Sequence, residues 1–238
     1  LKDAFAIYFL GFFWADGTIG RNDIRPRMTF KIKSSDFEVA IQPHLDRLGP
    51  FWHRSETRDR NHPHWSPLTV LSVSHRGLWG FLRSCGYHLK SGGSADKILA
   101  AIDPTLRHYW WRGYLDGDGS VTKQGRVVFN SGYAQDWGFV ETLGRELGVV
   151  FTIERYQRET QGGSKTVSGG AAHLQKVYDY LYRGESFGLE RKRERIVTWL
   201  RDHHPNKPHS SSYRGVGWRK NTSKWLMQIS HNGTYFSQ

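Results

Sequence analysis

Cysteine is almost absent from the sequence, since Cys85 is the only one among 238 residues. A single cysteine excludes a disulfide framework and any zinc site built on cysteine ligands. Proteins of oxidising compartments are often held together by disulfides. We therefore expect an intracellular protein in a reducing compartment, either a bacterial cytoplasm, including one that expresses a phage gene, or an organelle.

Long hydrophobic runs are also missing. The longest apolar stretch, residues 4–15, falls short of the roughly 20 residues of a membrane-spanning helix and ends at Asp16. The chain shows no secretory signal peptide, and no basic amphipathic helix of the kind that lies on a membrane surface. We therefore expect no membrane partner.

Acidic residues are few relative to basic ones. The 22 Asp and Glu residues stand against 34 Lys and Arg residues, so the formal net charge is +12 and the isoelectric point is near 9.9. Such an excess indicates a polyanionic partner, and without an amphipathic helix nucleic acid fits better than an anionic membrane. The hydrophobic content of 37% is sufficient for one large domain or for two halves with separate cores.

The sequence does contain an internal repeat. The segment YFLGFFWADGTIG aligns with the later segment WWRGYLDGDGSVT, so that Asp16 coincides with Asp118 at an offset of 102 residues. The similarity continues downstream of both segments, and each half reads as helix, strand, strand, helix, strand, strand, helix. The repeat therefore predicts one α+β unit with two pseudo-symmetric αββαββα halves. The predicted parts are a first repeat, a second repeat, a polar linker and a C-terminal β segment, at residues 1–101, 102–200, 201–212 and 213–238.

The predicted strands show a period-two alternation. In residues 27–33, Met28, Phe30 and Ile32 alternate with polar and basic residues, and residues 151–158 alternate in the same way. Because strand side chains alternate between the two faces of a sheet, one face is predicted to be core and the other exposed and basic. Basic residues recur in both halves, and we assign these to a DNA-binding surface: Arg21, Arg25, Arg27, Lys33, Arg54, Arg58, Arg60, Lys123, Arg126, Arg155, Arg158 and Lys165.

The two repeated segments are predicted to be helices. The first, residues 3–15, is apolar on nearly every side, which is typical of a buried helix. Asp103 followed by Pro104 is typical of the start of the second, which is expected to run to Gly117. Each has small residues four apart, which let two backbones approach closely: Gly11 and Ala15 in one, Gly113 and Gly117 in the other.

Packing through these small residues brings Asp16 and Asp118 out together at one end of the helix pair. Helix C-termini already carry partial negative charge, and two adjacent carboxylates repel each other. Fold stability does not call for this arrangement, but a hard divalent cation stabilises it. Cations held beside a basic surface can activate water and stabilise the leaving oxygen of a phosphodiester.

Both motifs, FLGFFWADG and WRGYLDGDG, resemble those of the LAGLIDADG homing endonucleases in their single-chain, two-motif form. The resemblance covers about residues 3–200. It implies a saddle that straddles double-stranded DNA and makes a magnesium-dependent double-strand break across the minor groove, as a monomer with internal pseudo-twofold symmetry. The first motif departs from the family, because Trp14 stands where an acid is common, whereas the second keeps Asp116.

The resemblance also implies roles for particular residues. The last acid of each motif, Asp16 and Asp118, binds metal and is catalytic. The family's carbonyl ligands map to Ala15 and Gly117, and the expected cofactor is two or three Mg²⁺ ions, for which Mn²⁺ or Ca²⁺ can substitute in binding. Residues that assist catalysis map to Lys31, Asn130 and Arg76, and the second-half counterpart of Arg76 is either His173 or Gln175.

Other metal sites fit less well. The segment DGDGSV hints at a calcium-binding EF-hand loop, but Val121 and Val127 stand where that loop needs Gly and Glu. The histidines at 62, 64, 203 and 204 lack cysteine partners or a second ligand pair at useful spacing, so loop histidines are the better interpretation.

The C-terminal segment resembles the start of an Apetala-type DNA-binding domain, through the pattern YRGV, W, KW, I and NGTYF. An Asn-Gly pair predicts a hairpin turn there. The sequence ends before the helix of that domain, so the segment is either cut short or a hairpin appendage, and a sheet edge packed on the main body is the plainer alternative. Its candidate DNA contacts are Arg214, Trp218, Arg219, Lys220, Lys224 and Trp225.

The sequence thus predicts a site-specific homing endonuclease linked to intron or intein mobility. Base readout is expected from Arg to guanine and from Asn or Gln to adenine. The alternative is a non-cleaving relative on the same scaffold, either a maturase that binds its host intron RNA or a DNA-binding regulator.

Overall fold

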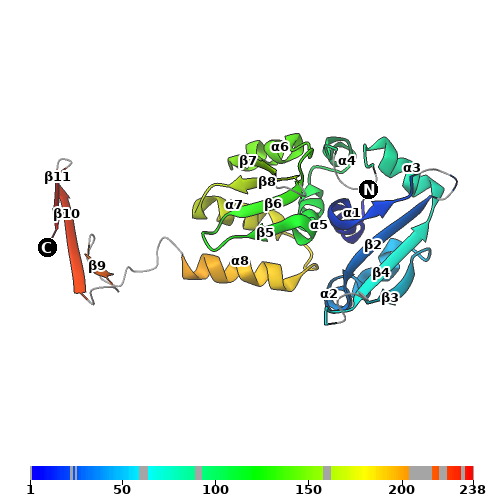
Figure 1. Cartoon of the computed structure of the whole chain (residues 1–238), viewed down its shortest axis with the longest axis horizontal. Coiled ribbons are helices and arrows are strands. Elements are labelled where there is room, and N and C mark those ends of the chain that lie inside the picture. Colours follow the sequence, from blue (N-terminus) through cyan, green and yellow to red (C-terminus); the bar gives the residue numbers. More distant parts are fainter. Residues whose placement is uncertain are drawn as a thin grey trace. The chain divides into compact units, whose positions relative to one another are not determined.

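Figure 1 shows a computed structural model of the chain. It describes residues 2–21, 24, 26–58, 64–88, 93–157 and 162–203, together with the backbone of three C-terminal strands. The chain divides into two compact units, Leu1–Leu200 and Arg201–Gln238.

The first half of the larger unit has the predicted order of elements, with an added 3-10 helix and a short helix that leads to the second half. Its elements are α1 (Ala4–Asp16), β1 (Thr18–Ile19), β2 (Arg27–Lys33), α2 (Ser34–Ala40), η1 (Gln42–Leu48), β3 (His53–Thr57), β4 (Leu68–Ser74), α3 (Arg76–Ser84) and α4 (Asp96–Ala100).

The second half repeats this order and ends in an additional helix. Its elements are α5 (Arg107–Asp118), β5 (Gly119–Val121), β6 (Val127–Gly132), α6 (Gly138–Leu147), β7 (Phe151–Gln157), β8 (Gly162–Ser168), α7 (Ala171–Leu181) and α8 (Glu190–Asp202).

Each half contains one four-stranded antiparallel sheet. The strand orders β1-β2-β4-β3 and β5-β6-β8-β7 are the same order in the two halves. The central strand β2 buries Met28, Phe30 and Ile32 and exposes the basic residues between them, as the alternation predicts. The predicted α+β fold with two pseudo-symmetric halves is therefore confirmed.

The α1 and α5 helices lie between the two sheets and pack side by side (Figure 1). A Cβ atom added to Gly11 would overlap the main-chain carbonyl oxygen of Trp110, and one added to Gly113 would lie 2.7 Å from the Phe12 nitrogen. Only residues without a side chain allow the two backbones to lie this close. The predicted contact through glycines is thus present.

Aromatic side chains fill the core around this helix pair. Phe9 and Phe30 pack at 5.2 Å between ring centroids on one side, and Trp111 stacks on Phe139 at 5.5 Å on the other. Burying one aromatic side chain stabilises the fold by roughly 2–3 kcal/mol. The core therefore continues through both halves and holds the helix pair in a fixed position.

The predicted start of the second motif helix is wrong by a few residues. Asp103 does not cap it, because its carboxylate accepts a hydrogen bond from the Thr105 amide at 2.8 Å and forms a separate turn. The helix begins at Arg107, after this turn. An Asp side chain that binds the amide two residues ahead offers the backbone an alternative to the helix.

The smaller unit contains a three-stranded antiparallel sheet in the order β11-β10-β9. In the β10–β11 pair, His231 lies opposite Thr234, as the predicted hairpin requires. The strands are β9 (Val216–Arg219), β10 (Lys224–His231) and β11 (Thr234–Ser237). The Apetala-type assignment of this segment stays a prediction.

Among the described residues, no helix is both long enough and apolar enough to pass through a bilayer. The buried helix α1 has 13 residues, fewer than a spanning helix needs. Its apolar surface is covered by protein instead.

Candidate active site and nucleic-acid interface

The two motif acids lie at equivalent places, because Asp16 is the last residue of α1 and Asp118 the last residue of α5. A Cβ atom added to Gly117 would overlap the Ala15 Cβ and lie 3.2 Å from Oδ2 of Asp16. The Asp16 carboxylate therefore reaches across the helix interface to the residue before Asp118. The two helices bring the acids of both motifs to one place.

The acids also act on shared neighbours. Asp16 is exposed and Asp118 is half-buried. Burial raises the pKa of the Tyr87 and Tyr114 hydroxyls, and the charges of Asp118 and Asp16 raise the pKa of both further. Both carboxylates therefore lie close enough to Tyr87 and Tyr114 to raise the pKa of each hydroxyl.

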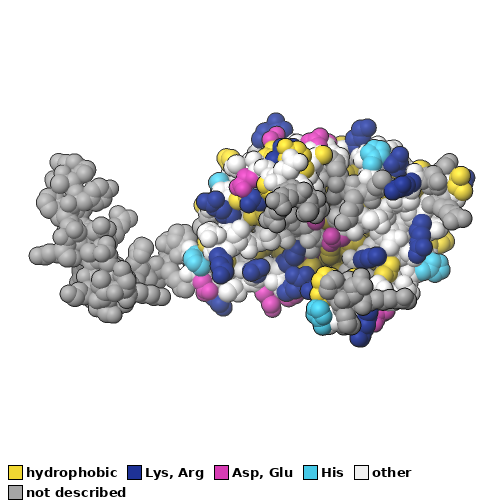
Figure 2. All heavy atoms as spheres, viewed as in Figure 1, with side chains coloured by type: hydrophobic (Ala, Val, Ile, Leu, Met, Phe, Trp, Pro, Cys, Tyr) yellow, Lys and Arg dark blue, Asp and Glu magenta, His cyan; other side chains and the backbone are white. Residues whose placement is uncertain are grey.

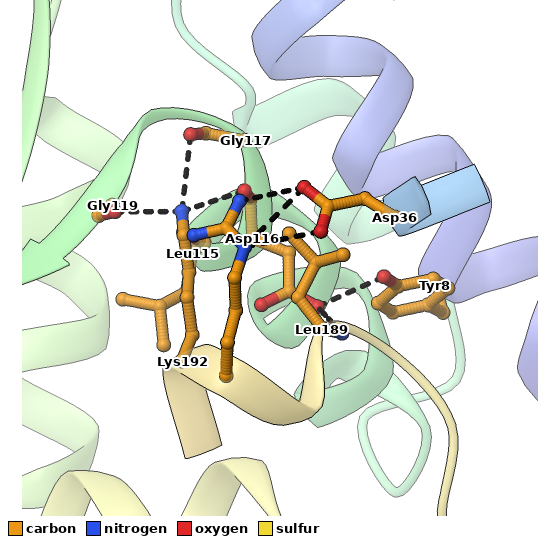
Figure 3. Close-up of polar contacts among 9 residues, drawn as sticks. Tyr8, Asp36, Leu115, Asp116, Gly117, Gly119, Leu189 and Lys192 are labelled. Carbon is orange, nitrogen blue, oxygen red and sulfur yellow. Dashed lines mark hydrogen bonds and ion pairs between the residues drawn. The ribbon is translucent and has the colours of Figure 1, made fainter. Parts of the chain in front are cut away.

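Beneath Asp118, a lysine that we did not single out from the sequence holds the end of α5. Figure 3 shows the Lys192 ammonium among the carbonyl groups of this helix end. It donates to four carbonyl oxygens, those of Leu115 at 2.8 Å, Asp116 at 2.6 Å, Gly117 at 3.2 Å and Gly119 at 2.8 Å. Cations are favoured at helix C-termini, where carbonyl groups lack intrahelical partners.

Asp116 connects this helix end to the first half. Its Oδ2 accepts hydrogen bonds from the Tyr8 hydroxyl at 2.8 Å and from the Leu189 amide at 2.9 Å (Figure 3). Burial raises the pKa of Asp116 to about 6, although these donors and the charges of Lys192 and Arg112 act in the opposite direction. Asp116 is therefore a structural acid that lies in the interior.

The end of α1 is supported differently. The Tyr87 hydroxyl donates to the Gly17 carbonyl at 2.5 Å and lies 3.3 Å from the Phe13 carbonyl oxygen. Trp14 occupies the position equivalent to Asp116 and packs against Tyr87 at 4.9 Å between ring centroids. A neutral phenol and an indole thus stand in the first half where an ammonium and a carboxylate stand in the second.

Lys31 and Asn130 occupy equivalent strand positions. Thr18 lies two residues after Asp16 and pairs with Thr29, and Ser120 lies two residues after Asp118 and pairs with Val128. Lys31 lies two residues after Thr29 in β2, and Asn130 lies two residues after Val128 in β6. Both side chains are exposed. The predicted alignment of these two positions is present in the strand register, and their catalytic role stays a prediction.

The strand neighbours of these two residues differ. Lys31 pairs with Val70 of β4, whereas Asn130 pairs with Lys165 of β8. Lys165 also forms an ion pair with Glu154 at 2.9 Å. The lysine at or beside the expected catalytic position is therefore Lys31 of β2 in the first half and Lys165 of β8 in the second.

Arg76 lies beyond the sheet. It is the first residue of α3 and is exposed, two residues after β4 ends. The helix-start position in the second half is held by Ala171, the first residue of α7. His173 and Gln175 lie further along that helix, so neither takes the position of Arg76.

Several of the predicted DNA-contacting residues lie on the exposed faces of the two sheets, and others are exposed outside the strands. Arg27, Lys31 and Lys33 share the exposed face of β2, and Lys165 shares the face of Asn130. Arg21, Arg58, Lys123 and Arg126 are exposed outside the strands. Figure 2 shows Lys and Arg side chains on both halves of one face of the larger unit.

Arg54 of β3 and Arg155 of β7 are exposed on edge strands, but their guanidinium groups are bound by neighbouring protein groups, and their DNA contacts stay a prediction. Arg54 lies opposite the buried Leu71, stacks over the Phe37 ring at 4.6 Å and forms an ion pair with Glu38. In β7, Arg155 lies opposite the buried Ser164 and donates to the carbonyl groups of Tyr133 at 3.3 Å and Gln135 at 3.1 Å. In both strands the guanidinium is bound on the helix-covered side, because that side offers carboxylate or carbonyl acceptors.

The remaining predicted contacts cannot be placed. Outside the described residues lie Arg25, Arg60, Arg158, Arg214 and Lys220. Only the backbone is described for Trp218 and Arg219 of β9 and for Lys224 and Trp225 of β10.

A divalent cation fits the end of the helix pair by the chemistry of its donors. The carboxylates of Asp16 and Asp118 and the carbonyl groups of Ala15 and Gly117 are all oxygen donors, which magnesium and calcium prefer. Within the described parts of the chain, no cluster of three or more His, Cys, Asp or Glu side chains could hold a metal. A cation here would depend on two acids, on main-chain oxygens, and on water or phosphate.

Arg112 is a further residue that the sequence reasoning missed. Its buried guanidinium donates to the carbonyl groups of Leu181, Arg183, Glu185 and Phe187 at 2.7–3.3 Å. A charged residue within a helix that is otherwise buried could have indicated such a contact. No local pattern indicates Lys192 or Tyr87, because their partners are distant in the sequence.

Among the solved structures with this fold are homing endonucleases bound to DNA. I-DmoI with DNA and Ca covers 82% of this chain and 97% of its own, with a TM-score of 0.56 and 13% identity. I-DmoI with DNA and Mn covers 76% and 98%, with a TM-score of 0.54 and 14% identity. I-WcaI bound to its DNA recognition sequence covers 79% and 85%, with a TM-score of 0.54 and 12% identity.

No protein-family model matches the chain, and no curated protein matches it in sequence. At these identities the structural likeness shows the fold. The larger unit therefore has the fold of these homing endonucleases, with the two motif helices at its centre.

Proposed function

We propose that the protein is a site-specific DNA endonuclease that cuts both strands of a long target in the presence of Mg²⁺. The observation that carries this proposal is the convergence of Asp16 and Asp118 at the ends of two helices that pack through glycines. Two sheets whose exposed sides carry basic residues flank this helix pair. The fold is shared with homing endonucleases whose structures contain DNA and Ca or Mn.

Asp16 and Asp118, with the carbonyl groups of Ala15 and Gly117, would hold two or three Mg²⁺ ions. Bound there, the ions would activate water and stabilise the leaving oxygen of the phosphodiester. The exposed strand residues Lys31 and Asn130 orient water and phosphate from the sheet side, with Lys165 next to Asn130. Arg76 contributes positive charge from the start of α3.

The exposed sheet faces supply DNA binding. Arg27, Lys33 and Lys165 contact phosphates and fix the register, and polar side chains on the same faces read base edges. The protein acts as a monomer, because its two halves provide the twofold arrangement that a duplex requires. The C-terminal β segment adds contacts outside this footprint, and the gene spreads with an intron or intein.

The test is cleavage of DNA that joins the two sequences flanking the insertion point of the gene. The wild-type protein is expected to linearise a plasmid carrying this junction when Mg²⁺ is present. Asp16→Asn and Asp118→Asn are expected to bind the plasmid without linearising it. Glu141→Gln on the exposed side of α6 is the matched acid control and is expected to cut normally.

Two outcomes would contradict the proposal. If the wild-type protein binds the junction but leaves it intact with Mg²⁺, the protein is a DNA-binding regulator. If it instead promotes splicing of its host intron RNA and both Asn variants do the same, it is a maturase.

A further inference from the structure

The ends of α1 and α5 differ in the side chain that binds their carbonyl groups. Lys192 of α8 donates to four carbonyl oxygens at the end of α5, at 2.6–3.2 Å. Tyr87 donates to one carbonyl oxygen at the end of α1, that of Gly17, and lies 3.3 Å from a second. Asp118 thus lies at a helix end that an ammonium group binds through several hydrogen bonds, and Asp16 lies at a helix end that a neutral hydroxyl binds.

The Lys192 ammonium has only main-chain acceptors in this network (Figure 3). Burial lowers its pKa, although the charges of Asp116, Asp16 and Asp118 act in the opposite direction. An ammonium has three N–H donors, so four carbonyl groups use its full capacity. The lysine is therefore committed to the helix end and does not reach DNA.

The helix that carries Lys192 is itself fixed to both halves. The neighbouring Arg191 forms an ion pair with Asp36 of α2 at 2.8 Å, and Asp36 is largely covered. At the other end of α8, the Trp199 indole N–H donates to the Lys123 carbonyl at 3.0 Å. Because α8 is held at several points, Lys192 has a defined position under the α5 end.

The position matters because the bonded carbonyl groups surround Asp118. Gly117, whose carbonyl group is a candidate cation ligand, accepts one of the four hydrogen bonds, and Gly119 on the other side of Asp118 accepts another. Fixing the backbone on both sides of an acid fixes the direction of its Cα–Cβ bond and so limits the region that its carboxylate can reach. Residues that orient ligands in this way affect metal affinity about 10- to 100-fold when replaced.

We propose that Lys192 is a positioning residue that holds Asp118 and the Gly117 carbonyl group in the geometry that binds a divalent cation. The proposal rests on the proposed function, since it assigns a role toward the cation of that site. Tyr87 serves the same purpose for Asp16 with fewer hydrogen bonds. In a pseudo-twofold protein on a duplex, each half faces one strand, so the effect of Lys192 is specific to one strand.

The first test measures Mn²⁺ binding by electron paramagnetic resonance on the DNA-free protein. Lys192→Met keeps most of the length of the side chain but removes its donors, and it is expected to weaken Mn²⁺ binding at least about tenfold. Tyr87→Phe removes the hydroxyl that binds the end of α1 in the other half. This change is expected to weaken Mn²⁺ binding only about two- to threefold. Unchanged Mn²⁺ binding by a folded Lys192→Met variant would overturn the proposal.

The second test follows the two DNA strands separately during cleavage of the junction plasmid. Lys192→Met is expected to accumulate a plasmid nicked in one strand, with kcat reduced and KM for DNA unchanged, and Tyr87→Phe to favour nicking of the opposite strand. Equal slowing of both strands would show a general structural role and would also overturn the proposal. If Lys192→Met does not fold, Lys192→Gln, which keeps two N–H donors, is measured in its place against the same criteria.

These tests separate the inference from the proposed function. A wild-type protein that binds Mn²⁺ but cuts no DNA would end the nuclease proposal, whereas the Mn²⁺ comparison between wild type and Lys192→Met would still decide the role of Lys192.

Discussion

The two motif helices share one backbone arrangement but differ in the side chains that surround it. Helix α1 is apolar along its length, and its Leu10 and Trp14 pack among hydrophobic neighbours. At the equivalent positions α5 carries Arg112 and Asp116, which are buried and hydrogen-bonded. The two halves therefore keep the same geometry with two different chemistries.

This difference separates what the helix pair requires from what it tolerates. The glycines at the contact and the acids at the ends occur in both halves, because close backbone approach and the shared end depend on them. The intervening positions differ, because an interior position is stable either with apolar packing or with hydrogen bonds to its polar groups, such as those of Arg112 and of Oδ2 of Asp116. The ionic network of the second half also ties down the 181–189 segment and α8.

The largest expected effect comes from the feature that the halves share. Gly11→Ala and Gly113→Ala each place a methyl group against the other helix backbone, and each is expected to lower the free energy of unfolding by about 3–4 kcal/mol. Urea unfolding followed by tryptophan fluorescence measures this. Gly80→Ala is the control, since its Cβ would meet open space in α3, and it should be neutral or slightly stabilising. Near-normal stability of either contact variant would contradict the close packing.

The next effect tests a feature of the second half alone. Arg112→Leu introduces the first-half residue and leaves four main-chain carbonyl groups without their donor. Unsatisfied buried acceptors are destabilising, so we expect a loss of about 2–3 kcal/mol in the free energy of unfolding. Leu10→Met in the first half is the volume-conserving control and should lose well under 1.5 kcal/mol. A loss of the same size in both variants would remove the distinction between the halves.

A smaller effect concerns pH. Burial, together with the charges of Arg183 and Arg112, lowers the pKa of His108 to about 4. Between the unfolded value of about 6.5 and this value, the unfolded chain binds a proton that the folded chain does not, so stability falls as the pH falls. We expect the wild type to lose about 1–2 kcal/mol more than His108→Gln between pH 7 and pH 5, measured by urea unfolding. Parallel pH profiles for the two proteins would refute this assignment.

The smallest effects concern DNA affinity. Arg27→Ala in the first half and Lys165→Ala in the second remove charges from the exposed sheet faces, and each should weaken DNA binding about threefold and lower its salt dependence by about one phosphate contact. Arg54→Ala and Arg155→Ala are the matched controls, because protein groups already bind both guanidinium groups. Fluorescence anisotropy at several salt concentrations distinguishes them. Equal losses of DNA affinity in all four variants would mean that Arg54 and Arg155 contribute to DNA binding as much as Arg27 and Lys165 do.

Much of the fold could be predicted from particular residues. The alternation of Met28, Phe30 and Ile32 predicted a sheet with one covered face, and the pairing of Asp16 with Asp118 predicted two equivalent halves. The alternation puts Arg155 on the same face as Phe151 and Ile153, but counting basic residues alone did not separate Arg54 and Arg155 from the others. A basic residue on that side is stable when an aromatic ring or a carbonyl group binds it. The start of α5 was misplaced because Asp103 forms a turn of its own.

The doubled plan, the buried motif helices and the acids at their ends were contained in the sequence, because periodicity, small-residue spacing and repetition are properties of neighbouring residues. The supports beneath those acids were decided only by the tertiary structure. Lys192 lies 77 positions from Leu115, and Tyr87 lies 70 positions from Gly17. Which donor reaches a helix end depends on how segments that are distant in the sequence pack against each other. No local pattern in the chain predicts that packing.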